Sequence, residues 1–328
     1  MNPPHRGFWQ VVWQRYRKSR IGMISLVMIA FFVVVAVFAP IIANDKPLIM
    51  IDTKLRLPAF FHDKELVTVR DYRAYVLEKK AFAVFPLVSR SPYTTDLYQR
   101  FSPPSWDHPM GTDELGRDIL ARMIHGATVS LTVGIVATLI TLVLGVLFGA
   151  FAGYYGGIAD MLISRLIEVV ICFPSFFIIL AVISALKPNI LNVMVVIGLF
   201  GWTGIARLVR AEFLRVKNSE YVEAARVVGA GHASVIFRHI LPNVLTPVLI
   251  SVSFTIASSI LIESSLSFLG MGVQPPTASW GQVMEKALSD LTNWWLFIFP
   301  GGAIFYTLLG YNLMGETLRD ALDVKGGV

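Results

Sequence analysis

The chain has 328 residues, of which 55% are hydrophobic, with a mean hydropathy of +0.64 and a formal net charge of +6. This balance excludes an ordinary soluble domain. Several apolar windows reach about twenty residues, the length that crosses roughly 30 Å of hydrocarbon, and they predict an all-α polytopic membrane protein with six transmembrane helices in a lipid bilayer. The basic residues cluster beside these windows, which indicates membrane topology and excludes a nucleic-acid partner.

The N-terminal residues 1–20 are basic and contain no acidic residue, and an uncharged stretch, residues 21–43, follows them. That stretch is longer than the apolar core of a signal peptide and has no small-residue cleavage site after it. We therefore expect a cytosolic N-terminal tail (residues 1–20) and an uncleaved first transmembrane helix (residues 21–43). The aromatic residues of the tail favour an interfacial helix.

A polar, proline-rich segment occupies residues 44–126, and its acidic and basic residues nearly balance. We expect it to be an external, periplasmic segment that is rich in loops, with one helix within residues 65–80. Two interpretations stay open. The segment is either a binding surface for an external partner or a passive cap.

The last part of this segment, His108 to Asp118, reads HPMGTDELGRD. An EF-hand calcium loop is excluded because the alternating acids and the distal glutamate are absent. We expect a turn capped by Thr112 or Asp113 that leads into an amphipathic approach helix. The residues that define this motif are Gly111, Thr112, Asp113, Gly116, Arg117 and Asp118.

Residues 127–318 are predicted to form a five-helix core, followed by a cytosolic tail (residues 319–328). The five expected spans are residues 127–151, 161–185, 190–207, 244–262 and 291–313. Glu168 lies within a span three residues after Arg165, so it is either a functional intramembrane carboxylate or half of a structural pair. The tryptophans Trp280, Trp294 and Trp295 are expected at the outer membrane interface.

A polar loop, residues 212–243, separates two of these spans. Ser219 and the acids Glu220 and Glu223 predict the start of a short helix, which Gly229 and Gly231 should end. A second short helix should follow and break before Pro242. The loop has no nucleophile beside a base, so it suits docking of a partner rather than catalysis.

Two motifs carry a resemblance to a known family. The spacing Glu223-Ala224-Ala225, Gly229, Leu241-Pro242 resembles the EAA loop of ABC importer permeases, and HPMGTDELGRD resembles a second hallmark of the same family. The ending RHILPN is similar to the dipeptide/oligopeptide branch, with His239 where the broad consensus has isoleucine. The stretch from Ile42 to Leu48, with the extended external segment, looks like the Yej-type importers.

This resemblance implies the type I ABC importer fold and a permease subunit for di- or oligopeptides. The implied partners are a second homologous permease, two ATP-binding subunits and an external substrate-binding protein. The chain would sit in the bacterial inner membrane with both termini cytosolic. The residues implied to transmit the ATPase movement are Glu223, Ala224, Ala225, Gly229, Leu241 and Pro242.

The sequence also sets expectations about catalysis and leaves some alternatives open. It has no GxxxxGK[ST] motif, so ATP would be bound by the partner subunits. No cofactor, metal site or enzymatic activity is expected. Nickel chelates or glutathione remain alternative substrates. An ATP-independent secondary transporter is the remaining class, although it should show inverted repeats and midplane charges.

Overall fold

The computed structural model describes residues 8–51, 55–57, 69–79, 81–288 and 290–322. The chain divides into two compact units. Unit 1 comprises Met1–Ile29, Val133–Ile262 and Thr307–Val328, and unit 2 comprises Ala30–Thr132 and Glu263–Tyr306.

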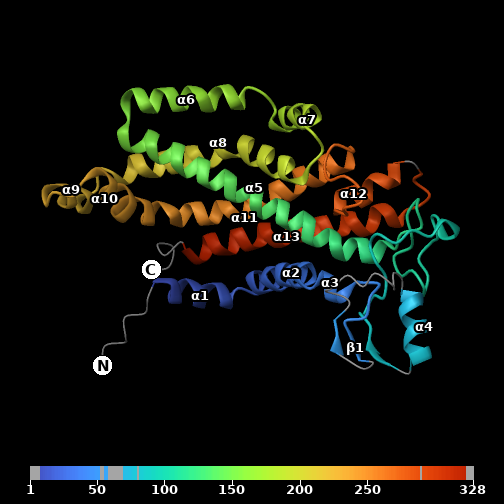
Figure 1. The fold of residues 1–328 in the computed structure, drawn as a ribbon. Helices are drawn as coiled ribbons and strands as arrows, with labels where there is room; N and C mark the ends of the chain where they lie inside the picture. Colours follow the sequence, from blue (N-terminus) through green and yellow to red (C-terminus); the bar gives the residue numbers. More distant parts are fainter. Residues whose placement is uncertain (1–7, 52–54, 58–68, 80, 289, 323–328) are drawn as a thin grey trace, which may run out of the picture. The chain divides into compact units, whose positions relative to one another are not determined.

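Helices dominate both units, as the sequence predicts (Figure 1). The α-helices are α1 (Phe8–Lys18), α2 (Arg20–Val37), α3 (Ala39–Ile42), α4 (Val69–Lys79), α5 (Ile119–Tyr155), α6 (Gly157–Ile171), α7 (Ser175–Ala185), α8 (Ile190–Val216), α9 (Glu220–Val227), α10 (His232–Ser234), α11 (Leu241–Phe268), α12 (Trp280–Glu285) and α13 (Trp295–Leu322). Short 3-10 turns lie at Leu97–Gln99 and Lys286–Leu288, and Val235–Ile240 is a π-helix.

Within the described residues, five helical segments are long and apolar enough to cross a membrane, namely α2, α5, α8, α13 and the continuous helical run His232–Phe268. The α6–α7 pair supplies a sixth span only if it is counted as one, because its two helices are bent by 80°. The expected span over residues 161–185 therefore consists of two helices with a sharp bend between them. Pro174 stands at the N-cap of α7 and cannot donate a backbone hydrogen bond, so the helix ends before it.

The approach helix and the second span are one helix in the structure. α5 begins at Ile119 and runs 37 residues without a break. The expected boundary at residue 127 rested on a change from amphipathic to uniformly apolar sequence. A change of this kind marks a change of surroundings along a helix and does not end the helix.

Unit 2 contains a small antiparallel sheet that the sequence analysis did not predict. Its strand order is β2 (Leu55–Arg56), β1 (Ile49–Ile51), β3 (Phe82–Val84), with Met50 paired to Arg56 on one side and to Ala83 on the other. The helix expected within residues 65–80 is confirmed as α4, which lies beside this sheet in Figure 1. Strands of two or three residues are too short to give an alternation pattern.

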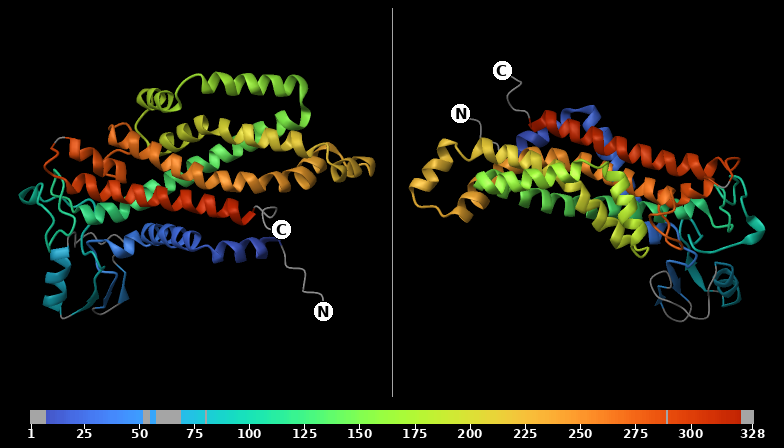
Figure 2. Two further views of the ribbon diagram at one scale, coloured as in Figure 1. Left: turned by 180° about the vertical axis from the view of Figure 1, so that it is seen from behind. Right: turned by 90° about the horizontal axis from the view of Figure 1, so that it is seen from above.

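Close packing of α5 against α8 organises unit 1. Gly145 and Gly149 of α5 face Ile205 and Val209 of α8, and a Cβ atom at either glycine would lie 2.6–2.7 Å from the Cβ of its neighbour. Small residues of this kind let two helix backbones approach closely in a membrane. The two helices run side by side in Figure 1 and in both views of Figure 2.

The N-terminal helix α1 also belongs to unit 1. It buries Val12 and Tyr16 against Ala321 of α13, while Trp9 and Trp13 are exposed on its other side. The interfacial position of this amphipathic helix stays a prediction.

Candidate functional site

The predicted docking loop is helical and extends beyond the ends of α8 and α11 (Figures 1 and 2). Its first helix, α9, begins after Ser219 as expected. The Ser219 hydroxyl does not cap the helix, however. It donates to the main-chain oxygen of Val216 at 2.7 Å. Glu220 and Glu223 lie in the first turn, where carboxylates interact favourably with the helix dipole.

Only one side of α9 is attached to the protein. Val222 is completely buried, whereas Glu223 and Ala224 are exposed and Ala225 is half-buried. The end of the helix carries Val227 and Val228, which are 87% and 88% exposed. Two valines with so much exposed surface at the tip of a loop are typical of a surface that a partner covers.

Gly229 ends α9 as the sequence predicts. Its φ angle of +92° lies in the left-handed region, which glycine adopts without strain. The Ala230 N–H donates to the oxygen of Ala225, and the Gly229 N–H donates to that of Arg226, which together form a Schellman motif. A Cβ at Gly229 would meet nothing within 4 Å, so the backbone angle alone selects glycine here.

The second half of the loop differs from the prediction. The expected break before Pro242 is absent, because helix continues from His232 through Phe268. The π-helical segment Val235–Ile240 comes directly before α11. At its end, the Leu241 N–H donates to the main-chain oxygen of Ile236, five residues earlier. Pro242 follows the π-helical segment within this continuous helix, and its nitrogen has no hydrogen to donate to the preceding turn. Leu241 is half-buried and Pro242 is exposed.

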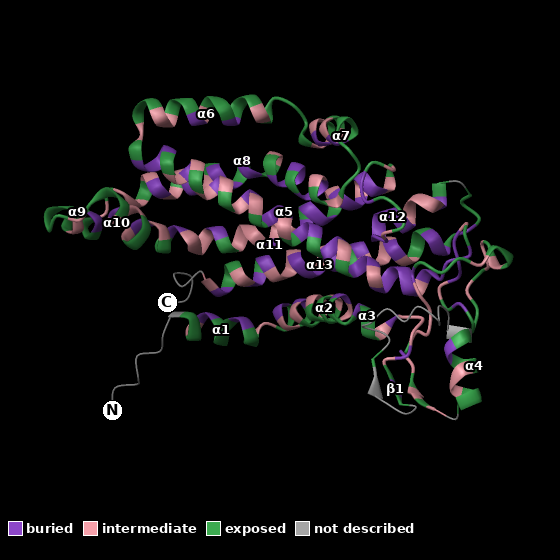
Figure 3. Cartoon of the chain, viewed as in Figure 1, coloured by how far each residue is buried: buried purple, intermediate pink, exposed green. Residues whose placement is uncertain are grey.

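An apolar cluster within unit 1 packs the loop against the ends of α8 and α11. Val222, Val235 and Ile240 pack in one core with residues from α8 and α11. Figure 3 shows that α9 and α10 are largely exposed around this attachment. The contacting residues on the neighbouring helices are Ile205, Val209, Phe213, Val244 and Val248.

A polar contact, not predicted from the sequence, ties the loop to α5. The hydroxyl of Tyr154 lies 2.8 Å from Nδ1 of His232, and the guanidinium of Arg226 lies 5.9 Å from the centre of the Tyr154 ring. Tyr154 is buried near the end of α5. The two contacts join the last turn of a membrane helix to both halves of the loop.

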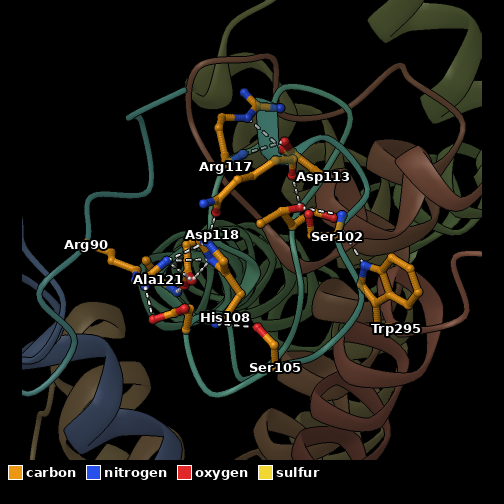
Figure 4. A network of polar contacts seen from close by, with 12 residues as sticks. Arg90, Ser102, Ser105, His108, Asp113, Arg117, Asp118, Ala121 and Trp295 are labelled. Atoms are coloured by element: carbon orange, nitrogen blue, oxygen red, sulfur yellow. Dashed lines mark hydrogen bonds and ion pairs between the residues drawn. The ribbon is translucent and has the colours of Figure 1, made fainter. Parts of the chain in front are cut away.

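The second motif forms a buried polar network in unit 2 (Figure 4). The Asp113 carboxylate accepts hydrogen bonds from the N–H groups of Leu115 and Arg117 at 2.9 and 3.0 Å, and from Nε of Arg117 at 2.6 Å. Nε of Arg122 lies 3.7 Å from the same carboxylate, and the Arg122 guanidinium also donates to Gln282 at 2.5 Å. Asp113 thus compensates two buried cations.

Asp113 caps the turn before the helix, as the sequence predicts, because its carboxylate accepts from the N–H groups of Leu115 and Arg117. The cap of α5 itself, which the sequence analysis did not identify, is Asp118. Its carboxylate accepts from the N–H of Ala121 at 2.8 Å, and its second oxygen lies 2.8 Å from Nδ1 of His108. An aspartate directly before the first helical residue satisfies a free N–H of the first turn. Asp113 instead organises the preceding turn, where its own N–H donates to the oxygen of Arg117.

Thr112 and the two glycines of the motif determine the path of the main chain next to this network. Thr112 donates its hydroxyl to the oxygen of Gln99 at 2.5 Å and accepts from the N–H of Ser102 at 2.8 Å. Gly111 and Gly116 have φ angles of +75° and +69°. The motif therefore reads as a structural element that holds the start of α5.

The tryptophans expected at the outer interface do not all lie on the surface. Trp280 and Trp295 are buried within unit 2, and Nε1 of Trp295 donates to the oxygen of Thr112 at 3.1 Å. Of the three, only Trp294 is exposed. Burial is possible for the other two because main-chain oxygens accept their indole N–H groups.

Two carboxylates within or next to the expected spans occur in different environments. Glu168 forms the pair with Arg165, at 2.5 Å, and both side chains are largely exposed. Glu263 is completely buried in unit 2, where Ser267 and Ser130 donate to it at 2.7 and 3.2 Å. Among the described residues, no group of three or more His, Cys, Asp or Glu side chains has the geometry of a metal site.

Comparison with known families gives two matches. Residues 145–323 match the family described as the binding-protein-dependent transport system inner membrane component. Residues 7–58 match the N-terminal TM domain of oligopeptide transport permease C. Together the two matches cover the N-terminal helices, the docking loop and the helices that flank it.

Individual proteins agree with these matches. The chain is 31% identical over 318 residues to the oligopeptide transport system permease protein OppC of Bacillus subtilis (strain 168), with 97% of this chain and 90% of that protein covered. It is 32% identical over 324 residues to the dipeptide transport system permease protein DppC of the same organism, at 98% and 87% coverage. The glutathione transport system permease protein GsiD of Pectobacterium atrosepticum is 42% identical over 223 residues, at 68% and 74% coverage.

A solved structure has a similar fold. An inward-facing conformation of the MetNI methionine ABC transporter matches with a TM-score of 0.50 and 16% identity, covering 62% of this chain and 97% of that chain. At this identity the likeness concerns the fold alone.

Proposed function

The chain belongs to the family of inner membrane components of binding-protein-dependent transport systems, and from this we propose that it is a permease subunit of an ATP-driven peptide importer. As a multi-pass membrane component of this family it is a transport subunit and not an enzyme. The near full-length similarity to oligopeptide and dipeptide permeases supports peptides as the substrate class.

The observation that carries the coupling part of the proposal is the form of the docking loop. Glu223, Ala224 and the two exposed valines face outward, while Val222 fixes the helix to a buried cluster. The small side chains of Ala224 and Ala225 would let α9 enter a groove of a partner deeply. Glu223 is exposed, so it can pair with a basic residue in that groove. We assign Glu223, Ala224, Ala225, Gly229, Leu241 and Pro242 to contact with, or transmission from, an ATP-binding subunit.

The proposed assembly has two permeases, two ATP-binding subunits and an external binding protein. ATP is bound by the partner subunits, and the chain itself requires no cofactor. Moving a transporter from mostly one conformation to mostly the other takes about 5.5 kcal/mol of differential binding, which nucleotide in the partner subunits would provide. The chain responds by alternating access.

The orientation follows from the charge pattern. We propose that the docking loop and the basic N-terminal region lie in the cytosol, because basic residues concentrate in the short inner segments. Both termini are then cytosolic. Under this orientation residues 44–126 form the external segment of a bacterial inner-membrane protein.

The first experiment is purification of the tagged chain in mild detergent from its native host. We expect two P-loop ATPases and a second permease to accompany it. Replacing both Ala224 and Ala225 by Trp should remove the ATPases on steric grounds, whereas Ala181→Trp, at an exposed position of α7, should retain them. Recovery of the chain alone, with uptake intact in vesicles without ATP, would show a secondary transporter instead.

A second variant tests transmission. Gly229→Asp should leave the fold intact, because aspartate tolerates a left-handed conformation at a cost of about 1–3 kcal/mol and the site has free space. The added charge lies beside the proposed interface, so peptide uptake per ATP hydrolysed should fall. Normal peptide uptake by this variant would contradict the role assigned to the loop.

A further inference from the structure

A cavity of about 440 Å³ opens within unit 1 between α5, α7, α8 and α11. This volume lies within the range of small-molecule sites in proteins. Part of its wall is apolar and includes Ile179, Ile197 and Phe254. The remainder is rich in hydroxyl groups, which belong to Thr141, Ser175, Ser251, Thr255, Ser258 and Ser259.

Two hydroxyl groups of α11 that line the cavity are already engaged as donors. Thr255 donates to the main-chain oxygen of Ser251 at 2.8 Å, and Ser258 donates to that of Phe254 at 2.9 Å. A hydroxyl oxygen has two lone pairs besides its single proton. Once the proton is used within the helix, the lone pairs remain available to a ligand, so this wall presents hydrogen-bond acceptors.

The cavity wall is also electrically neutral. Among the described residues that line it, none is Asp, Glu, Lys, Arg or His. Unit charges about 8 Å apart at an effective dielectric constant near 20 change binding by roughly thirtyfold. A neutral wall therefore neither weakens the binding of a ligand with a charged side chain by repulsion nor strengthens it by attraction.

We propose that this cavity contacts the main chain of a peptide in transit, through its hydroxyl oxygens and apolar surface, and does not distinguish peptides by side-chain charge. The N–H groups of an extended peptide are the donors that an acceptor-rich wall requires. The inference rests on the proposed transport function and adds to it a site and a recognition rule. Selection by side chain then takes place before the peptide reaches this chain.

The test introduces a charge at Ser258, which is exposed and therefore tolerates a new side chain. The complete importer is reconstituted with its binding protein, and uptake of the tripeptides Ala-Ala-Ala, Ala-Glu-Ala and Ala-Lys-Ala is measured. For Ser258→Asp, the uptake ratio of the acidic to the basic tripeptide should fall at least tenfold relative to wild type. Ser258→Lys should raise this ratio, and the neutral tripeptide reports whether each variant is still assembled.

A matched control separates this site from a general charge effect. Ser184→Asp places the same charge at an exposed serine of α7 that does not line the cavity, and its uptake ratio should equal that of wild type. An unchanged ratio in both Ser258 variants, or an equal loss of all three tripeptides, overturns the inference. Absence of uptake of every tripeptide by the wild-type complex would instead refute the proposed peptide transport itself.

Discussion

Replacing Asp113 by Asn should destabilise unit 2 strongly. The Asp113 side chain is 1% exposed and neutralises Arg117, itself 5% exposed, across 2.6 Å, with Arg122 at 3.7 Å. Asparagine retains one oxygen for the two turn N–H groups, but its amide nitrogen would face the guanidinium of Arg117. Removing one partner of a buried ion pair costs about 3–5 kcal/mol, because the remaining charge is left without compensation.

The measurement is the apparent Tm of the purified protein in detergent. At about 2–4 °C per kcal/mol, the Asp113→Asn variant should unfold at least about 6 °C below wild type. Glu168→Gln is the matched control, since it removes the same kind of charge from a pair that is 74% and 58% exposed. Exposed pairs contribute about 0–1 kcal/mol, so this control should shift Tm by no more than a few degrees. Equal Tm values for the two variants would refute the structural role assigned to the motif.

Two further predictions concern the loop and the external segment. Tyr154→Phe removes the hydroxyl that contacts His232 but keeps the ring, so we expect a loss of about 1 kcal/mol and more ATP hydrolysed per peptide than in the control Tyr155→Phe. Equal ratios in the two variants would contradict the link. Burial raises the pKa of Asp45 above its ordinary value, so ionisation of this carboxyl opposes folding. The neutral form of Asp45 therefore favours the folded state. This contribution to the free energy of unfolding is fully present below about pH 4, and it is lost as the pH rises through the folded-state pKa of Asp45. Asp45→Asn should therefore be more stable than wild type at pH 7 and equal to it near pH 4, whereas a Tm difference independent of pH would contradict this cause.

Features that depend on neighbouring residues were predictable from the sequence. Apolar length predicted the membrane helices, and Gly229 predicted the end of α9, because a left-handed C-cap has a local chemical requirement. The family resemblance, based on two short motifs, is confirmed by the match over residues 145–323.

Features that depend on distant residues were not predictable. The contact between Tyr154 and His232 joins positions 78 residues apart, and that between Arg122 and Gln282 joins positions 160 apart. No local pattern indicates such partners. The cap of α5 was not predicted, for a related reason. The motif holds two aspartates, and only the folded turn shows that Asp113 serves the arginines and Asp118 serves the helix.

The close packing of α5 and α8 has a mechanical consequence. α8 has 27 residues and is therefore about 40 Å long, with the cavity beside Ile197 and the docking loop beyond Phe213. Gly145 and Gly149 of α5 pack closely against it, so under the proposed function we expect the two helices to move together as one rigid body. A displacement of the docking loop would then reach the cavity as a rigid-body movement of the helix pair. The side chains between the loop and the cavity would not need to repack.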